Sequence, residues 1–207
     1  DQEYFLYALF YLNDSHSIPN IFRELRENYA GLLARFLWPA DWAPRDPLVR
    51  IHAFIAMPNH YHLVLEETRE GGVPLFMQKF GTGLTNRYNI RYDASGNLFQ
   101  GKYKYALVDR ERYLQSVGLY VQVKNAFELY PGGLEKARKE FDAAFDFACM
   151  YPFGSLSHYA GKHRTPIIDG DDSAFFEVKN ARAYKDFARS VLLNQDFSDM
   201  IESVKID

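Results

Sequence analysis

Two spacings of apolar residues recur along this chain, and each predicts a type of secondary structure. Short runs rich in aromatic and branched residues predict strands at residues 4–12, 48–56, 60–67 and 102–108. Apolar positions three and four residues apart predict helices at residues 18–38, 73–92, 110–130, 134–150 and 181–194. A tight turn at residues 57–59 joins the second and third strands as an antiparallel hairpin, and Asp109 caps the third helix.

The order of these elements predicts a fold class. Strand, helix, strand, strand, helix and strand follow one another up to about residue 130. This order matches an α+β, ferredoxin-like antiparallel sheet with helices on one face. We therefore expect a core domain at residues 1–130 and a C-terminal helical extension, packed on that core, at residues 131–207.

Composition narrows the class of protein. Of 207 residues, 47% are hydrophobic and 16% aromatic, which indicates a well-filled core. Cys149 is the only cysteine, so a disulfide within the chain and a cysteine-rich zinc site are both excluded, and a reducing cytoplasm is expected. The sequence contains no secretory signal and no apolar run of about 18 residues, so we expect neither secretion nor a membrane span.

The charge of the chain is unevenly distributed. Its net value is −3, which is unlike a polycation that coats nucleic acid. Residues 79–112 nevertheless carry seven basic side chains against three acidic ones. This excess predicts a local basic face beside the third strand.

The third strand opens with two histidines separated by one residue. Because side chains alternate along a strand, His60 and His62 project from the same face, where two imidazoles can share one metal ion. Two histidines on a partly solvated sheet face can equally bind nothing. Glu66 has the same parity, so a site of two histidines and one carboxylate is an alternative, as is a solvated carboxylate at the end of the strand.

The helix expected at residues 110–130 carries a polar strip next to a tyrosine. Lys124 follows Tyr120 by one turn on the same face, and Gln122 and Asn125 lie close in sequence. Periodicity alone places Tyr120 in the core. The strip is unusual for a buried face.

Four ordered motifs resemble those of one known family. Residues 56–64 read AMPNHYHLV, residues 96–104 read GNLFQGKYK, residues 112–114 read RYL with YV at 120–121, and residues 151–155 read YPFGS. They resemble the segments MPNHxH, GxLFQGRYK, YL…YI and YPWSS of the single-tyrosine HUH transposases, in particular the REP-associated tyrosine transposases of bacteria. The resemblance runs from about Tyr4 to Val191.

This resemblance implies the HUH endonuclease fold and a metal-dependent transposase. Such an enzyme cleaves and rejoins single-stranded DNA near hairpin sequences of the REP type. His60 and His62 would hold Mg²⁺ or Mn²⁺, and Tyr120 would attack a DNA phosphate and form a 5′-phosphotyrosine intermediate. The residues expected to contact DNA phosphates are Arg87, Arg91, Lys102 and Lys104. The resemblance requires no nucleotide cofactor and no membrane, and it implies a monomer or homodimer in the bacterial cytoplasm, associated with the nucleoid.

One position departs from the family pattern. Family members commonly carry Asn or Gln as a third metal ligand four residues after the tyrosine, where this chain has Lys124. A protonated lysine cannot ligate a metal, but it can contact a phosphate or assist ionisation of the phenol. Gln122, Asn125, or water and DNA oxygens would then complete the metal shell.

Two other functions are alternatives, and the departure permits the first of them. The first is a hairpin-DNA-binding regulator that keeps the fold but has lost cleavage. The second is an unrelated metal hydrolase that uses the two histidines with Glu66.

Overall fold

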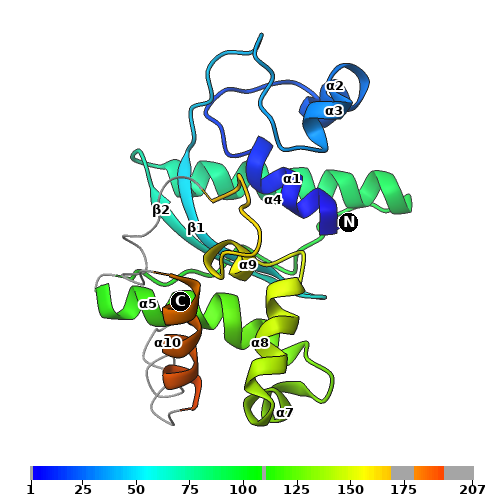
Figure 1. Cartoon of the computed structure of the whole chain (residues 1–207). Helices are drawn as coiled ribbons and strands as arrows, with labels where there is room; N and C mark the ends of the chain where they lie inside the picture. The colour runs from blue at the N-terminus through cyan, green and yellow to red at the C-terminus, as the bar shows by residue number, and fades with distance from the viewer. Residues whose placement is uncertain (1, 109–110, 169–179, 194–207) are drawn as a thin grey trace. The chain divides into compact units, whose positions relative to one another are not determined.

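Helices make up most of the described chain, and one antiparallel hairpin forms its sheet. The structure is a computed structural model that describes residues 2–108, 111–168 and 180–193 (Figure 1). Within these ranges the fold is α+β, as predicted, but its sheet has two strands. The expected cap Asp109 lies outside the described residues.

The helices and strands have the following bounds. The strands are β1 (Val49–Ala56) and β2 (Tyr61–Glu67). The α-helices are α1 (Gln2–Tyr11), α2 (Ile21–Asn28), α3 (Ala30–Leu33), α4 (Gly72–Tyr92), α5 (Glu111–Leu119), α6 (Asn125–Glu128), α7 (Gly133–Lys139), α8 (Phe141–Met150), α9 (Leu156–Tyr159) and α10 (Ala181–Leu193). A π-helical turn, η1 (Tyr120–Lys124), joins α5 to α6.

The chain divides into two compact units. The first comprises residues 1–50 and 65–103, and the second comprises residues 51–64 and 104–207. Both strands of the hairpin run from one unit into the other. The boundary that we expected near residue 131 falls inside the second unit, and that division stays a prediction.

The first element of the first unit is a helix, so the strand predicted at residues 4–12 is wrong. Its buried side chains Phe5, Ala8 and Leu9 follow helical spacing, and Phe10 and Tyr11 widen the buried face at the C-terminal end of the helix. Phe5 packs edge-on against Phe80 of α4, with ring centroids 5.4 Å apart, and α1 lies against α4 (Figure 1). Aromatic residues favour strands only when a neighbouring strand is present to pair with them, and here α4 provides a helical surface instead.

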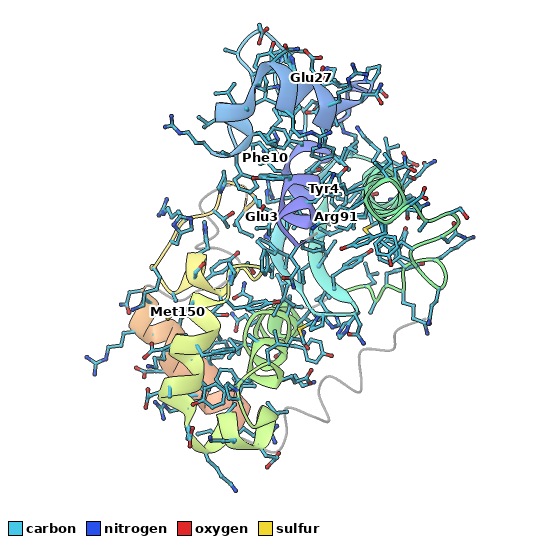
Figure 2. The ribbon with its side chains drawn as sticks, turned by 90° about the vertical axis from the view of Figure 1, so that its right-hand side faces the viewer. Glu3, Tyr4, Phe10, Glu27, Arg91 and Met150 are labelled. Atoms are coloured by element: carbon cyan, nitrogen blue, oxygen red, sulfur yellow. The ribbon has the colours of Figure 1, made fainter. Side chains whose placement is uncertain are left out.

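Aromatic side chains fill the rest of this unit around α1. Tyr4 and Phe10 project from α1 (Figure 2), and the Tyr4 ring lies 4.5 Å from that of Phe22 in α2. The Tyr11 hydroxyl donates hydrogen bonds to the carbonyl oxygens of Leu32 and Leu37, each at 3.1 Å. These contacts hold the segment predicted as one helix at residues 18–38, which the structure divides into α2 and α3 at Tyr29. The helix α4 matches its prediction to within one residue.

The hairpin forms where the sequence predicts it. The amide of Met57 donates to the carbonyl of His60 at 2.8 Å and closes a turn with Pro58 and Asn59 at its centre. Residues 153–155 pair with the other edge of β1. The Ala56 amide donates to the Phe153 carbonyl at 2.8 Å, and the Ser155 amide donates to the Phe54 carbonyl at 2.9 Å.

The fourth predicted strand is absent. Residues 102–108 are described and form no strand, and Tyr105 and Leu107 are 67% and 84% exposed. A strand needs a neighbour to satisfy its backbone groups, and neither strand of the described sheet pairs with this segment. With the first strand replaced by α1, the described residues contain no four-stranded ferredoxin-like sheet.

In the second unit, one face of the hairpin packs on helices. One buried cluster contains residues of the hairpin and of the segment 119–127. The hairpin contributes Ala53 and Ile55 from β1, Met57 from the turn and Val64 from β2. The helices α8 and α10 add Phe145, Tyr184 and other apolar residues to the same cluster.

The helices of this unit are more divided than predicted. The helix predicted at 110–130 exists as α5, η1 and α6, and the one predicted at 134–150 exists as α7 and α8, separated at Glu140. The predicted last helix corresponds to α10, which is described to Leu193.

A buried asparagine attaches the first loop to the start of β1. The side-chain oxygen of Asn13 accepts hydrogen bonds from the amides of Leu48 and Val49, at 3.1 and 3.0 Å. Its Nδ2 donates to the Val49 carbonyl at 2.8 Å. All three backbone groups are buried and lose their partner if this amide is removed.

We expect Asn13→Ala to lower the free energy of unfolding by about 2 to 4 kcal/mol, because buried backbone groups are left unsatisfied. Chemical denaturation followed by circular dichroism measures this change. Asn86→Ala on the exposed side of α4 is the matched control and should change stability by no more than about 0.5 kcal/mol. Equal effects of the two substitutions would contradict this role of Asn13.

Candidate functional site

Side-chain alternation along β2 brings the two histidines to the face that packs on the helices. Val64 is buried in the helix-facing cluster, and His62 lies two residues before it on the same side. The ring centroids of His60 and His62 are 5.0 Å apart, with the rings perpendicular. The structure thus brings together the pair that the sequence singled out.

The exposed His60 has one ring nitrogen oriented by its neighbour. Its Nδ1 lies 2.7 Å from Oδ1 of Asn59. Since an amide oxygen can only accept a hydrogen bond, Nδ1 is the donor here, and the neutral tautomer that makes this bond carries its lone pair on Nε2. Metal-binding histidines commonly donate their second ring N–H to an oxygen in this way.

The half-buried His62 is neutral at physiological pH. Burial lowers its pKa from 6.5 to about 4, and the positive charges of His60 and Lys124 act in the same direction, while Glu128 opposes them. A neutral imidazole offers a lone pair without first losing a proton.

Tyr120 contacts His62 from the start of the π-helical turn. The two ring centroids are 5.4 Å apart, and the rings are nearly perpendicular. The amide of Asn125 donates to the Tyr120 carbonyl, five residues earlier, which is the hydrogen bond that defines a π-helix. Such turns within helices are frequent at functional sites.

Lys124 and Glu128 extend the site along the helix. The Lys124 ammonium lies 4.9 Å from the centre of the Tyr120 ring and 2.5 Å from Oε1 of Glu128. Both side chains are partly exposed. The site therefore combines two imidazoles, a phenol, an ammonium and a carboxylate, of which the last two are paired.

The two amides proposed as third metal ligands are buried instead. Gln122 and Asn125 are each 1% exposed. The oxygen of Gln122 accepts a hydrogen bond of 2.5 Å from the Tyr184 hydroxyl, so its ligating atom is already occupied. Asn125 is equally enclosed, and its Nδ2 has no hydrogen-bond partner among the described residues.

No carboxylate takes their place. Among the described residues, no group of three His, Cys, Asp or Glu side chains is arranged to hold a metal ion. The alternative ligand Glu66 accepts a hydrogen bond from Nη1 of Arg50 at 2.8 Å. Among the described residues, the nitrogen donors brought together at this site are the imidazoles of His60 and His62.

The basic residues expected to bind DNA are divided between the two units. Arg87, Arg91 and Lys102 belong to the first unit, whereas Lys104 belongs to the second unit, with the histidines. Lys102 and Lys104 are exposed. The guanidinium groups of Arg87 and Arg91 lie over the rings of Tyr4 and Tyr92 respectively, each 5.6 Å from the ring centre.

Sequence reasoning missed three residues that support the site. Glu128 had a recognisable signal, because it follows Lys124 by four residues on a predicted helix. Asn59 adjoins His60 in the motif but was assigned only a turn. Tyr184 had no signal, because 62 residues separate it from Gln122.

Comparisons with known proteins assign no family to this chain. No protein-family model, no curated protein and no solved structure matches this chain. In the part of the chain that the structure describes, no helix is both long and apolar enough to cross a membrane.

The buried contact between Tyr184 and Gln122 is open to a stability test. Tyr184→Phe removes the hydroxyl and leaves a buried amide oxygen without its donor, so we expect unfolding to become easier by about 1 to 3 kcal/mol. Thermal or urea denaturation reports the change. Tyr88→Phe, on an exposed side chain, is the control. A Tyr184 variant as stable as that control would show that the contact contributes nothing.

The lowered pKa of His62 predicts a pH-dependent stability. Between pH 6.5 and about 4 the unfolded chain binds a proton at His62 that the folded protein does not bind, so stability falls as the pH decreases through this window. His62→Gln removes that contribution, so the loss of unfolding free energy between about pH 7 and pH 4.5 should be smaller than in the wild type. Urea denaturation at both pH values measures it. The exposed His163→Gln should behave as the wild type, and a His62 variant with the full pH-dependent loss would disprove the assignment.

Proposed function

We propose that this protein nicks single-stranded DNA and transfers the strand, with Tyr120 as the nucleophile. The observation that carries the proposal is the contact between Tyr120 and His62, with His60 beside them and Lys124 over the phenol ring. A nucleophilic hydroxyl, two imidazole ligands for a metal ion and a cation are groups that phosphoryl transfer can use. The histidines belong to the hairpin and the other two groups to η1, and the family motifs assign the metal and the nucleophile to these same two segments.

His60 and His62 are the residues that would hold a divalent ion. Their donors fit one, because the tautomer of His60 that donates to Asn59 offers Nε2 as a ligand atom and the imidazole of His62 is neutral. Bound Mg²⁺ or Mn²⁺ would supply a Lewis acid for a non-bridging phosphate oxygen. Imidazole ligands favour Mn²⁺ over Mg²⁺, and water or DNA oxygens would complete the shell.

Tyr120 and Lys124 carry the covalent step. A bond forms between the Tyr120 Oη and phosphorus while the bond from phosphorus to the 3′ oxygen breaks. The phenolic proton passes to water, and the departing 3′ oxygen takes up a proton from water, so the products are a 5′-phosphotyrosine and a free 3′-hydroxyl. The ammonium of Lys124, which lies over the phenol ring, attracts the phosphate to the nucleophile. Attack by another 3′-hydroxyl reverses the step, so rejoining needs no nucleotide cofactor.

This function extends the resemblance to the single-tyrosine HUH transposases. The hairpin with the two histidines and the helix with the tyrosine are the two parts of the HUH fold that the reaction uses, although the four-stranded sheet of that fold is not seen in the described residues. In this proposal the substrate is single-stranded DNA beside a REP-type hairpin, in the bacterial cytoplasm. Arg87, Arg91, Lys102 and Lys104 bind its phosphates, and the protein acts as a monomer or homodimer.

A covalent adduct tests the proposal directly. Incubation with hairpin-bearing oligonucleotides and Mn²⁺ should give a protein–DNA species on a denaturing gel, and Tyr120→Phe should abolish it. Tyr61→Phe, at a neighbouring position that faces away from the histidines, should keep it. An adduct that survives Tyr120→Phe, or no adduct with any repeat hairpin, would overturn the proposal.

The role of Lys124 can be separated with two substitutions. Lys124→Ala should slow adduct formation by about 100-fold, by the loss of one charged group at the phosphate. Lys124→Asn restores the amide of the family pattern and should lower the Mn²⁺ concentration needed for half-maximal rate. A slower Lys124→Asn variant with an unchanged metal requirement would contradict placement of this residue near the metal.

Lys124 and the enclosed amides also favour a second function, a hairpin-DNA-binding regulator without cleavage. It predicts DNA binding that needs no metal and is indifferent to Tyr120→Phe. The adduct assay distinguishes the two functions.

A further inference from the structure

The last two turns of α4 present a pair of aromatic rings to solvent. Tyr88 and Tyr92 are 38% and 52% exposed, and their ring centroids are 4.7 Å apart. Being four residues apart, they share one face of the helix. Large aromatic side chains usually bury most of their surface, so an exposed pair in mutual contact indicates a surface that binds a flat ligand.

Positive charge accompanies this pair. The guanidinium of Arg91, which is labelled in Figure 2, lies 5.6 Å from the centre of the Tyr92 ring. Arg91 is exposed. Arg87 precedes it by one turn. The only acidic residue between residues 79 and 103 is Asp93, so this surface favours an anionic ligand.

The backbone beneath the pair is well fixed. Asp93 ends α4 in the left-handed conformation, with φ of 48°, and its amide donates to the Asn89 carbonyl. The Asn89 side chain donates to the Gly96 carbonyl at 3.0 Å and ties the following loop to the helix. The rings therefore stand on a preorganised helix end, which reduces the entropy lost when a ligand stacks on them.

We propose that Tyr88, Arg91 and Tyr92 form a stacking platform for unpaired bases of single-stranded DNA. Exposed aromatic rings with an interleaved arginine bind the two parts of a nucleotide: the rings stack on the base, and the guanidinium pairs with the phosphate. The occupant follows from the proposed function, whose substrate is single-stranded DNA. The platform lies in the first unit, whereas Tyr120 lies in the second.

Fluorescence anisotropy with two labelled oligonucleotides tests the platform. One strand is poly-dT, and the other has the same length and phosphates but abasic sites in place of the bases. The wild type should bind poly-dT more tightly than the abasic strand. Tyr88→Leu and Tyr92→Leu should each weaken poly-dT binding by about 5- to 100-fold and leave abasic binding unchanged. Arg91→Gln should weaken both strands and reduce the slope of log affinity against log salt by about 0.7.

Ile90→Ala is the matched control, because this residue is 80% exposed on another face of the same helix. It should bind both strands as the wild type does. Tyrosine variants that keep the full preference for poly-dT would overturn the platform, and so would variants that lose abasic binding to the same degree.

The adduct assay separates this inference from the proposed function. If the wild type forms the adduct at Tyr120 but both leucine variants keep the wild-type preference for poly-dT, the platform is overturned and the strand-transfer reaction is not. Lost base preference in these variants, with no adduct from the wild type, would support the platform and overturn the strand-transfer reaction.

Discussion

The geometry of the site depends on the period-two alternation of β2. Val64 is fixed in the apolar cluster between the hairpin and the helices, and this contact sets the side to which every second residue points. His62 is consequently directed at Tyr120, and His60 stands beyond it in solvent. A shift of one residue in strand pairing would bury Tyr61 and Leu63 there instead and would remove both imidazoles from the tyrosine.

Local pattern was sufficient to predict the hairpin and α4, since both depend on spacing and turn residues within a short stretch. It failed at residues 4–12 and 102–108, where secondary structure depends on what lies alongside. Phe5 and Leu9 belong to a helix because α4 offers a helical surface. Residues 102–108 have strand-like composition, but no strand pairs with them.

The sequence likewise predicted only part of the candidate site. Alternation predicted that His60 and His62 share a face, and helical spacing predicted the neighbourhood of Tyr120 and Lys124. The burial of Gln122 could not be predicted, because it depends on Tyr184 in a distant helix. Nor could the π-helical turn, because the apolar spacing of residues 110–130 predicts a continuous α-helix.

The pairing of residues 153–155 with β1 has a consequence for association between copies of the chain. Strand edges with unpaired amides and carbonyls are templates for strands of other molecules. Along residues 54–56 the outer edge of β1 is already covered, by backbone hydrogen bonds to Phe153 and Ser155 and by the Tyr151 hydroxyl, which donates to the Ala56 carbonyl at 2.6 Å. This stretch cannot accept a strand from a second molecule, so the sheet beside the histidines is protected from intermolecular β-pairing on that edge.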